Sequence, residues 1–135
     1  MKIEDVHVQN VSATSVSHPF EILDHSKAGI SHVSFDNIRV EARYSSHITA
    51  PQQGTISNLS FRNVDIEMKH SDGLKYVETK PERTVMDCSG ADRLFLERIR
   101  IHMEESERKE WVHDVNFTEC SGVETFHCKI REANN

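Results

Sequence analysis

The sequence predicts an all-β protein folded as a right-handed parallel β-helix of about four to five coils, formed by the single segment 1–135. Three observations lead to this fold class. A short motif recurs along the chain, apolar residues alternate within each copy, and one position is asparagine in three copies. Stacked copies of a short motif are typical of solenoid proteins. The copies superpose without gaps at Val6–Val11, Val33–Ile38, Leu59–Val64 and Leu94–Ile99.

Each copy alternates apolar and polar residues, which is the period of a β-strand. The alternation breaks once per copy, because two residues rather than one separate Phe35 from Ile38. The second of these residues is asparagine at Asn10, Asn37 and Asn63. Asparagine tolerates the left-handed backbone conformation better than most residues. We therefore expect a one-residue kink between two short strands that face one interior.

A further strand is expected before several copies, which gives each coil the order strand, turn, strand, kink, strand and loop. The segments that fit this place are Pro19–Asp24, Thr84–Gly90 and Val115–Gly122. The last two contain Cys-Ser-Gly triplets that lie 32 positions apart. The triplets predict a fifth unit ending near Ile130, and they predict matching positions for Cys88 and Cys120.

The alternative fold is an antiparallel sandwich, which would show hairpin signals between adjacent strands. The one candidate signal in the sequence is Asp72-Gly73. It lies in the stretch His70–Arg83, which is interpreted as a loop. Glu104–Trp111 is polar and is expected to form at most a helical turn between strands.

Composition limits the classes of function. Lys and Arg number 16 against 22 Asp and Glu, and no basic run marks a nucleic-acid surface, so no nucleic-acid partner is expected. No apolar run reaches the roughly 20 residues that span a bilayer, so no membrane role is expected. The first residues lack the apolar stretch of a signal peptide. The sequence therefore assigns no location, and a larger protein that contains this chain is either secreted or cytoplasmic.

The histidines and cysteines do not predict a metal site or a cofactor. The nine histidines are scattered, and no Cys-x-x-Cys pair is present among the three cysteines. Matching positions would place Cys88 and Cys120 about one strand spacing apart, close enough for a disulfide. Stacked reduced thiols are the favoured interpretation, because cysteine is a common small core residue.

The repeated segments Gly29–Glu41 and Thr55–Glu67 resemble the C-terminal coils of glycoside hydrolase family 28. Ala91–Cys128 is similar to the last coils of bacterial members, so the resemblance covers nearly the whole chain. This family contains polygalacturonases and rhamnogalacturonan hydrolases that share the pectin-lyase-like β-helix. The resemblance implies a parent enzyme that cleaves pectin-type polysaccharide, either galacturonan or rhamnogalacturonan, by inverting hydrolysis.

The family's catalytic motifs are absent from this chain. Asn-Thr-Asp, Asp-Asp, Gly-His-Gly and Arg-Ile-Lys do not occur, and the nearest match, Arg98-Ile99-Arg100, is interpreted as strand composition. Inverting hydrolysis needs two carboxyl groups roughly 6.5 to 9.5 Å apart. Asp24 and Asp87 are expected at comparable places two coils apart, as solvated turn residues. We therefore expect no catalytic residue here, and a chain that is inactive alone and forms the C-terminal part of a larger β-helix.

The candidate substrate-binding residues are Glu21, Asp24 and His25, at the end of an early strand whose edge would continue a polysaccharide cleft. Trp111 stands among charged residues. It is interpreted as a lid packed over the last coil, with a sugar-stacking platform as the alternative.

The first coil is expected to lack a cap, since nothing before Val6 is long enough to cover it. An open solenoid end exposes apolar surface and unpaired backbone groups. We therefore expect end-to-end self-association through the N-terminal coil, or marginal stability. Two rival functions remain open: a non-catalytic carbohydrate-binding or adhesion β-helix, and part of a β-helix polysaccharide lyase.

Overall fold

The computed structural model describes residues 2–24, 29–52, 54–69, 83–108 and 111–129. Its strands form two parallel sheets. Sheet A has the order β1-β3-β5-β7-β9, from β1 (Ile3–Val16), β3 (Ile30–Ala42), β5 (Ile56–Met68), β7 (Ala91–Met103) and β9 (Glu124–Phe126). Sheet B has the order β2-β4-β6-β8, from β2 (Glu21–Leu23), β4 (Ser46–Thr49), β6 (Arg83–Ser89) and β8 (Trp111–Thr118).

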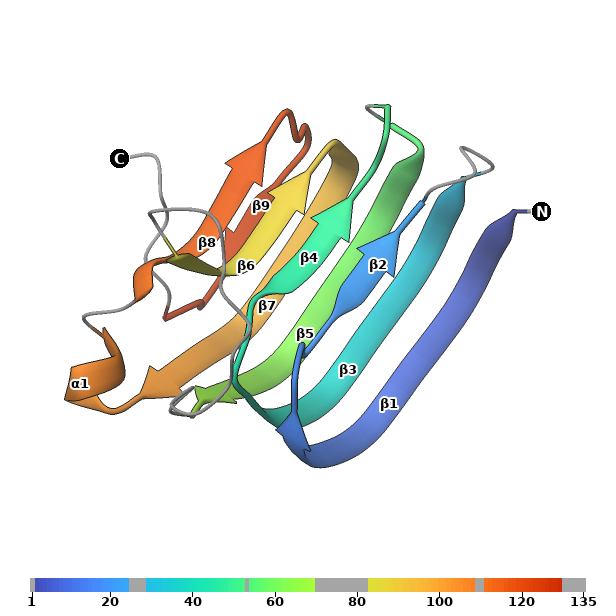
Figure 1. Cartoon of the computed structure of the whole chain (residues 1–135). Coiled ribbons are helices and arrows are strands. Elements are labelled where there is room, and N and C mark those ends of the chain that lie inside the picture. The colour runs from blue at the N-terminus through green and yellow to red at the C-terminus, as the bar shows by residue number, and fades with distance from the viewer. Residues whose placement is uncertain (1, 25–28, 53, 70–82, 109–110, 130–135) are drawn as a thin grey trace.

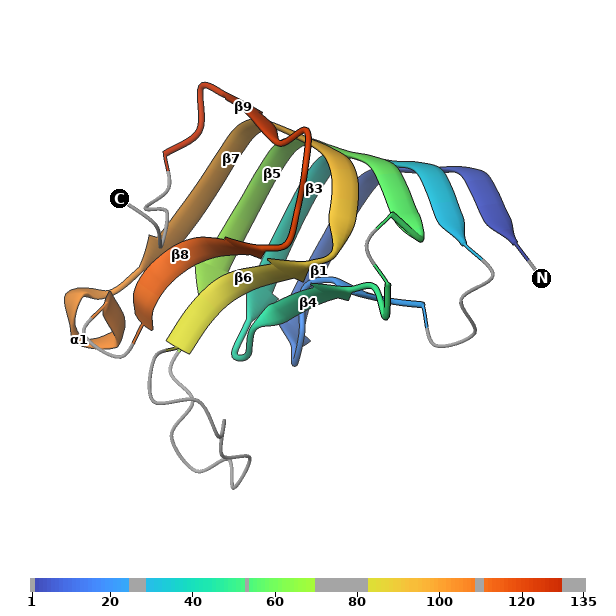
Figure 2. The same ribbon diagram turned by 90° about the horizontal axis from the view of Figure 1, so that it is seen from above.

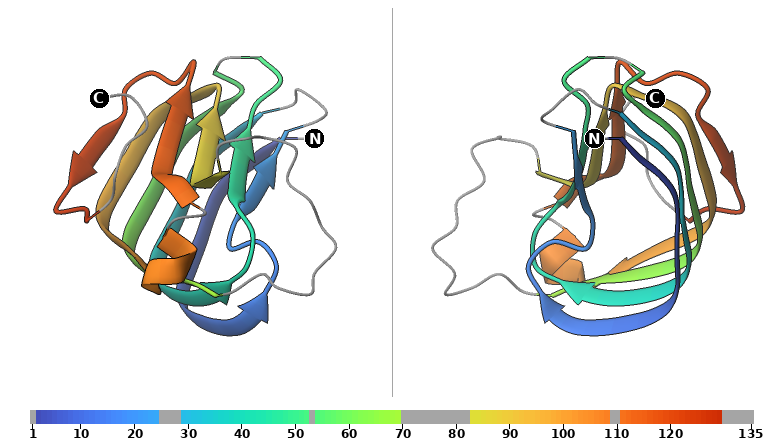
Figure 3. Two further views of the ribbon diagram at one scale, coloured as in Figure 1. Left: turned by 60° about the vertical axis from the view of Figure 1, so that its left-hand side comes forward. Right: turned by 90° about the vertical axis from the view of Figure 1, so that its right-hand side faces the viewer.

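The chain alternates between the sheets, as a parallel β-helix requires. Every strand pair is parallel, and each strand from β1 to β7 pairs with the second strand after it (Figure 1). The two sheets face each other as layers when the molecule is seen from above (Figure 2). Seen along the stack, the strands of successive coils superpose (Figure 3). The predicted fold class, an all-β parallel β-helix, is confirmed.

The predicted kink at asparagine is present, and the same left-handed conformation recurs in all five coils. Asn10, Asn37 and Asn63 have φ values of 57°, 58° and 54°, and the same register position is taken by Arg98 (54°) and His127 (53°). Backbone pairing resumes on both sides of each kink in the long strands, so each remains one continuous strand. The chain thus bends there without leaving the sheet.

Another kink, five residues earlier, was not predicted; it is here called the first kink of each coil, and the asparagine kink is the second. The first kink also has a positive φ in each coil, at Asp5 (59°), His32 (56°), Asn58 (55°), Arg93 (64°) and Gly122 (62°). The five residues share no chemical type, so residue identity alone does not mark the position. The left-handed conformation is costly for residues with a Cβ. Stacking of coils therefore maintains it here.

The fifth unit is present, but the sequence placed it in the wrong register. Asp92 bridges to Ser121, and Cys88 pairs with Phe117, so the last two coils are offset by 29 residues rather than 32. Cys120 consequently lies one residue before the Ser121 bridge, beside Ala91. The similarity of the two Cys-Ser-Gly triplets is therefore coincidental, and Cys88 and Cys120 do not occupy matching positions.

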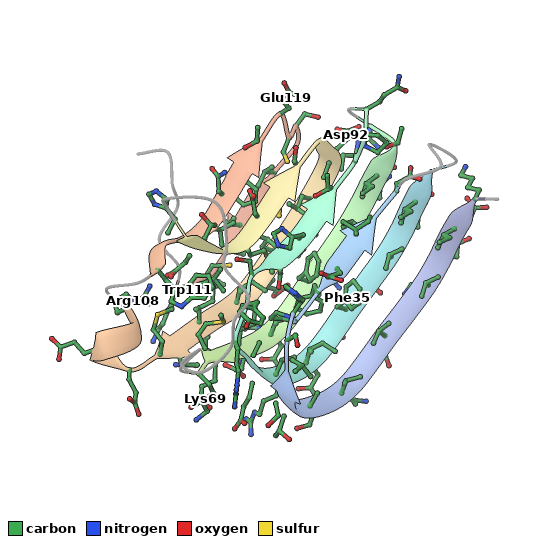
Figure 4. The ribbon with its side chains drawn as sticks, in the orientation of Figure 1. Phe35, Lys69, Asp92, Arg108, Trp111 and Glu119 are labelled. Atoms are coloured by element: carbon green, nitrogen blue, oxygen red, sulfur yellow. The ribbon has the colours of Figure 1, made fainter. Side chains whose placement is uncertain are left out.

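The core between the sheets is filled by the inward residues of both. Phe35 and Phe61 stack at 5.0 Å with an interplanar angle of 10°, and Phe20 meets both rings edge-on. Trp111, labelled with Phe35 in Figure 4, is 1% exposed. The sugar-stacking alternative for Trp111 is therefore wrong, and its indole is packed, as expected, within the core between the sheets.

The expected helical turn is present as α1 (Glu105–Arg108), between β7 and β8. The expected loop His70–Arg83 lies outside the described residues, except that Arg83 begins β6. In the described parts of the chain, no helix is long and apolar enough to cross a membrane.

The second kink carries a ladder of side-chain hydrogen bonds along the stack. Asn37 donates to Asn10 Oδ1 at 2.7 Å, and Asn63 donates to Asn37 Oδ1 at 3.1 Å. The fourth coil has Arg98 in place of asparagine. Arg100 Nη2 instead reaches back to Asn63 Oδ1 at 2.7 Å. A guanidinium thereby ends the ladder that three amide groups begin.

Candidate functional site

The outer face of sheet B carries a row of polar side chains, here called the polar row: Glu21, His47, Asp87 and Asn116. Strand pairing places these residues in register on β2, β4, β6 and β8. Their neighbours one position later pack against the core, because side chains alternate across a strand. Glu21 is exposed and the other three are half-buried. The polar row therefore crosses all four strands on one accessible face.

A second row lies beside it, two residues further along each strand. It comprises Leu23, Thr49, Ser89 and Thr118, again in register. Three of its members supply hydroxyl groups. The outer face of sheet B thus presents carboxylate, imidazole, amide and hydroxyl groups at the regular strand spacing of about 4.8 Å.

An imidazole cluster borders the polar row at the β2 end. His18 Nδ1 lies 2.7 Å from the Ser45 carbonyl oxygen, so this nitrogen carries a proton and donates it. Its Nε2 lies 3.8 Å from Glu21 Oε1. The His18 ring also lies 5.5 Å from the Tyr44 ring and 5.9 Å from the His47 ring. Protonation of His18 would create an ion pair with Glu21.

At the other end of the row, Asn116 Nδ2 donates to Asp87 Oδ1 at 3.2 Å and contacts Thr118 Oγ1 at 3.3 Å. Asp87, the acceptor, and Asn116, the donor, are thus held next to each other on neighbouring strands. Glu21 and Asp87 are separated by two strand spacings, about 9.6 Å along the stack.

The three sequence-predicted binding residues are not brought together on this surface. Glu21 lies in the polar row. Asp24 is 4% exposed, and its Oδ2 accepts a hydrogen bond from the Gly29 backbone N–H at 3.2 Å, which ties β2 to the start of β3. His25 lies outside the described residues.

The expected equivalence of Asp24 and Asp87 is wrong. Asp87 is in register with His47 and Glu21, whereas Asp24 follows Glu21 by three positions and lies in the turn after β2. Nor is Asp24 a solvated turn residue, since it is buried. Sequence reasoning missed His47, Asp87 and Asn116 as partners of Glu21, because it lacked the register of these short strands.

A groove of about 560 Å³ lies on the outer face of sheet A, beside the first kink, and is here called the kink groove. It touches all five coils. Its lining includes Arg62, Arg93, Phe95 and Glu124, together with hydroxyl, amide and imidazole groups from Ser34, Asn58, Ser60, His7 and His32.

The cysteines are free thiols. Cys120 Sγ contacts the Cys88 carbonyl oxygen at 3.4 Å rather than the Cys88 sulfur, so the expected reduced state is confirmed but the expected stacking of the two thiols is wrong. Burial raises the pKa of the Cys88 thiol well above its ordinary value, with smaller contributions from Cys120 and Asp87. Cys88 is therefore protonated and unreactive at neutral pH. Within the described residues, no group of three or more His, Cys, Asp or Glu side chains is arranged to hold a metal ion.

Comparison with known proteins identifies no relative: no family model, no curated protein and no solved structure matches the chain.

Proposed function

We propose that this chain is the C-terminal β-helix portion of a family 28-like glycoside hydrolase that cleaves galacturonan or rhamnogalacturonan by inverting hydrolysis. In this proposal the catalytic motifs belong to coils outside the sequence. The present coils complete the helix and extend the polysaccharide-binding surface. The observation that carries the proposal is the polar row, since four polar side chains stand in register across sheet B.

The chemistry of the polar row suits a sugar chain that runs along the stack. Carboxylates accept hydrogen bonds from sugar hydroxyls, and the Asn116 amide and the His47 imidazole supply donors. The hydroxyl groups of the adjacent row both donate and accept hydrogen bonds. A polymer that crosses the strands would meet Glu21 on β2 and then a pair of polar groups on each following strand, every ~4.8 Å. The surface thus provides repeated contacts without a deep pocket.

The experiment measures release of reducing sugar from polygalacturonic acid and rhamnogalacturonan. The 135-residue chain is compared with the same chain extended upstream through its native gene. We expect activity in the extended form alone. In that form, Glu21→Gln combined with Asp87→Asn should raise KM for the polymer several-fold and leave kcat unchanged. Glu41→Gln, on the outer face of sheet A, is the matched control.

Activity of the 135-residue chain alone would overturn this account. Glu21 and Asp87 would then become the first residues to test as an acid and base pair, because two strand spacings lie at the upper end of the separation used by inverting enzymes. An extended form without activity would instead favour a non-catalytic carbohydrate-binding or adhesion β-helix. The exposed Phe126, which packs beside Phe95 at 5.5 Å, is the observation in favour of that second candidate.

A further inference from the structure

The kink groove contains two arginines on neighbouring strands of sheet A. Arg62 projects outward from β5, and Arg93 stands at the first kink of β7. Both belong to a protein whose formal net charge is −6. The only carboxylate among the groove's described lining residues is Glu124, so the lining carries one excess positive charge with its histidines neutral.

Arg62 is held in place by its neighbours. Its guanidinium carbon lies 5.1 Å from the centre of the Phe95 ring, and its Nε lies 3.6 Å from Glu97 Oε1. Stacking on an aromatic face and an ionic contact through Nε favour one orientation of a guanidinium. The two terminal nitrogens make no hydrogen bond to any described residue, so they remain available in the geometry that binds an oxyanion with two hydrogen bonds.

Arg93 is positioned by the coil that follows. Gly122 lies directly beside it, and a Cβ at Gly122 would approach the Arg93 Cα and Cγ atoms to 3.3 Å. Glycine therefore allows the fifth coil to pack closely against the base of this side chain. Arg93 forms no ion pair within the described parts of the chain. Asp92, which precedes it (Figure 4), instead accepts a hydrogen bond from Ser121 at 2.6 Å.

We propose that the kink groove binds an oxyanion, carboxylate or phosphate, through Arg62 and Arg93, on a ligand that also carries hydroxyl groups. Acidic sugars and sugar phosphates both have this chemistry. Asn58 and Ser60 line the groove from the same strand as Arg62, with Ser60 in register with Phe95 on β7, and they supply partners for the ligand's hydroxyls. This site lies on the sheet opposite the polar row and does not depend on the proposed hydrolase function.

Glu124 is expected to oppose anion binding in the kink groove. Its carboxylate lines the groove from the fifth coil and repels an anion. Asp36, which is in register with Arg62 on β3, does not line the groove. Removing the charge of Glu124 should therefore strengthen anion binding, whereas removing that of Arg93 should weaken it.

The test is an NMR titration of the full chain with four probes: inorganic phosphate, a uronic acid, a hexose phosphate and an uncharged methyl hexoside. We expect the three anions to shift the amide resonances around Arg62 and Arg93, and the methyl hexoside to leave them unchanged. Arg93→Gln should weaken anion binding roughly fivefold to tenfold, as expected for one charged hydrogen bond at an exposed site. Glu124→Gln should strengthen it.

Arg39→Gln is the matched control, because it removes the same charge from sheet A outside the groove. Equal loss of affinity in Arg39→Gln and Arg93→Gln would overturn the proposal, since net charge alone would then explain binding. Equal binding of the methyl hexoside, or no change on Glu124→Gln, would also contradict it. Binding of inorganic phosphate at the same strength as the sugar anions would contradict the proposed contacts with the ligand's hydroxyl groups.

Discussion

The first and third coils have the same pattern of apolar residues but differ greatly in burial. Val6 in β1 is 40% exposed, whereas Leu59 at the same register position of β5 is 1% exposed. The same contrast separates Val11, at 40%, from Val64, at 0%. Both pairs occupy equivalent places in the repeat. The burial of a residue here is therefore decided by the coils on either side of it, as expected for a solenoid.

The largest expected effect tests this contrast directly. Leu59→Ala should lower the free energy of unfolding by about 2 to 5 kcal/mol, because it leaves a cavity between two coils. Val6→Ala removes a side chain from an exposed edge and should cost well under about 1 kcal/mol. Urea unfolding followed by circular dichroism measures both. Equal losses would mean that the first coil is covered in solution.

The asparagine ladder gives the next largest effect. Asn37 donates to one coil and accepts from the next, whereas Asn10 lies at the end of the stack. Asn37→Ala should cost about 2 kcal/mol, from the left-handed backbone and the lost hydrogen bonds. Asn10→Ala should cost less, since Asn10 has one ladder partner in the described residues.

Asn37→Gly separates the two contributions, because glycine adopts a positive φ without steric cost but cannot form the ladder. Thermal unfolding of Asn37→Gly beside Asn37→Ala is the measurement. If the two variants were equally unstable, the ladder hydrogen bonds rather than the backbone conformation would account for the whole loss.

The exposed edge of the first coil predicts association. Ile3, Val6 and Val11 are 40% or more exposed along an edge strand of sheet A. We expect the chain to self-associate through β1, because an edge strand with exposed apolar residues is a template for pairing. Val6→Lys combined with Val11→Lys should weaken association at least tenfold, or about 1.4 kcal/mol.

Light scattering over a range of concentrations measures this association. Leu23→Lys is the control, because it places the same charge on an exposed apolar residue of sheet B. A monodisperse monomer with high cooperative stability in the unmodified chain would contradict the prediction.

The two kinks of sheet A differ in how clearly the sequence predicts them. The repeat revealed sheet A and the second kink, because apolar residues three apart, such as Phe61 and Val64, mark a break in alternation. The first kink has the same signal in Ile56 and Leu59, but without a recurring residue type it was overlooked. Apolar spacing therefore marks both kinks, whereas the recurring asparagine marks only the second.

Sheet B and the candidate site were predicted less well, for a physical reason. Its strands are short, β2 and β4 having three and four residues, so alternation cannot fix their register. Glu21 was correctly chosen as a residue of this sheet, but its alignment with Asp87 was not found. Only the stacking of neighbouring coils brings these two carboxylates into one row.

The smallest expected effect concerns the fourth coil, where Arg100 ends the ladder. Arg100 Nε and Nη2 donate to the two oxygens of Asp65 at 2.6 and 2.9 Å. These hydrogen bonds hold the pKa of Asp65 below its usual value of 3.8. A lowered pKa in the folded state stabilises the protein at pH values above 3.8, and this stabilisation is lost as the pH falls through the folded-state pKa.

Because the pair is partly exposed, its contribution should be no more than about 1 kcal/mol. Asp65→Asn should lower the free energy of unfolding by that amount at pH 7 and have a progressively smaller effect below pH 3.8, whereas Asp36→Asn removes the same charge without removing this pair. Urea unfolding at a series of pH values measures both variants. If the loss in Asp65→Asn were unchanged in acid, the ion pair between Asp65 and Arg100 would not be what stabilises the fourth coil.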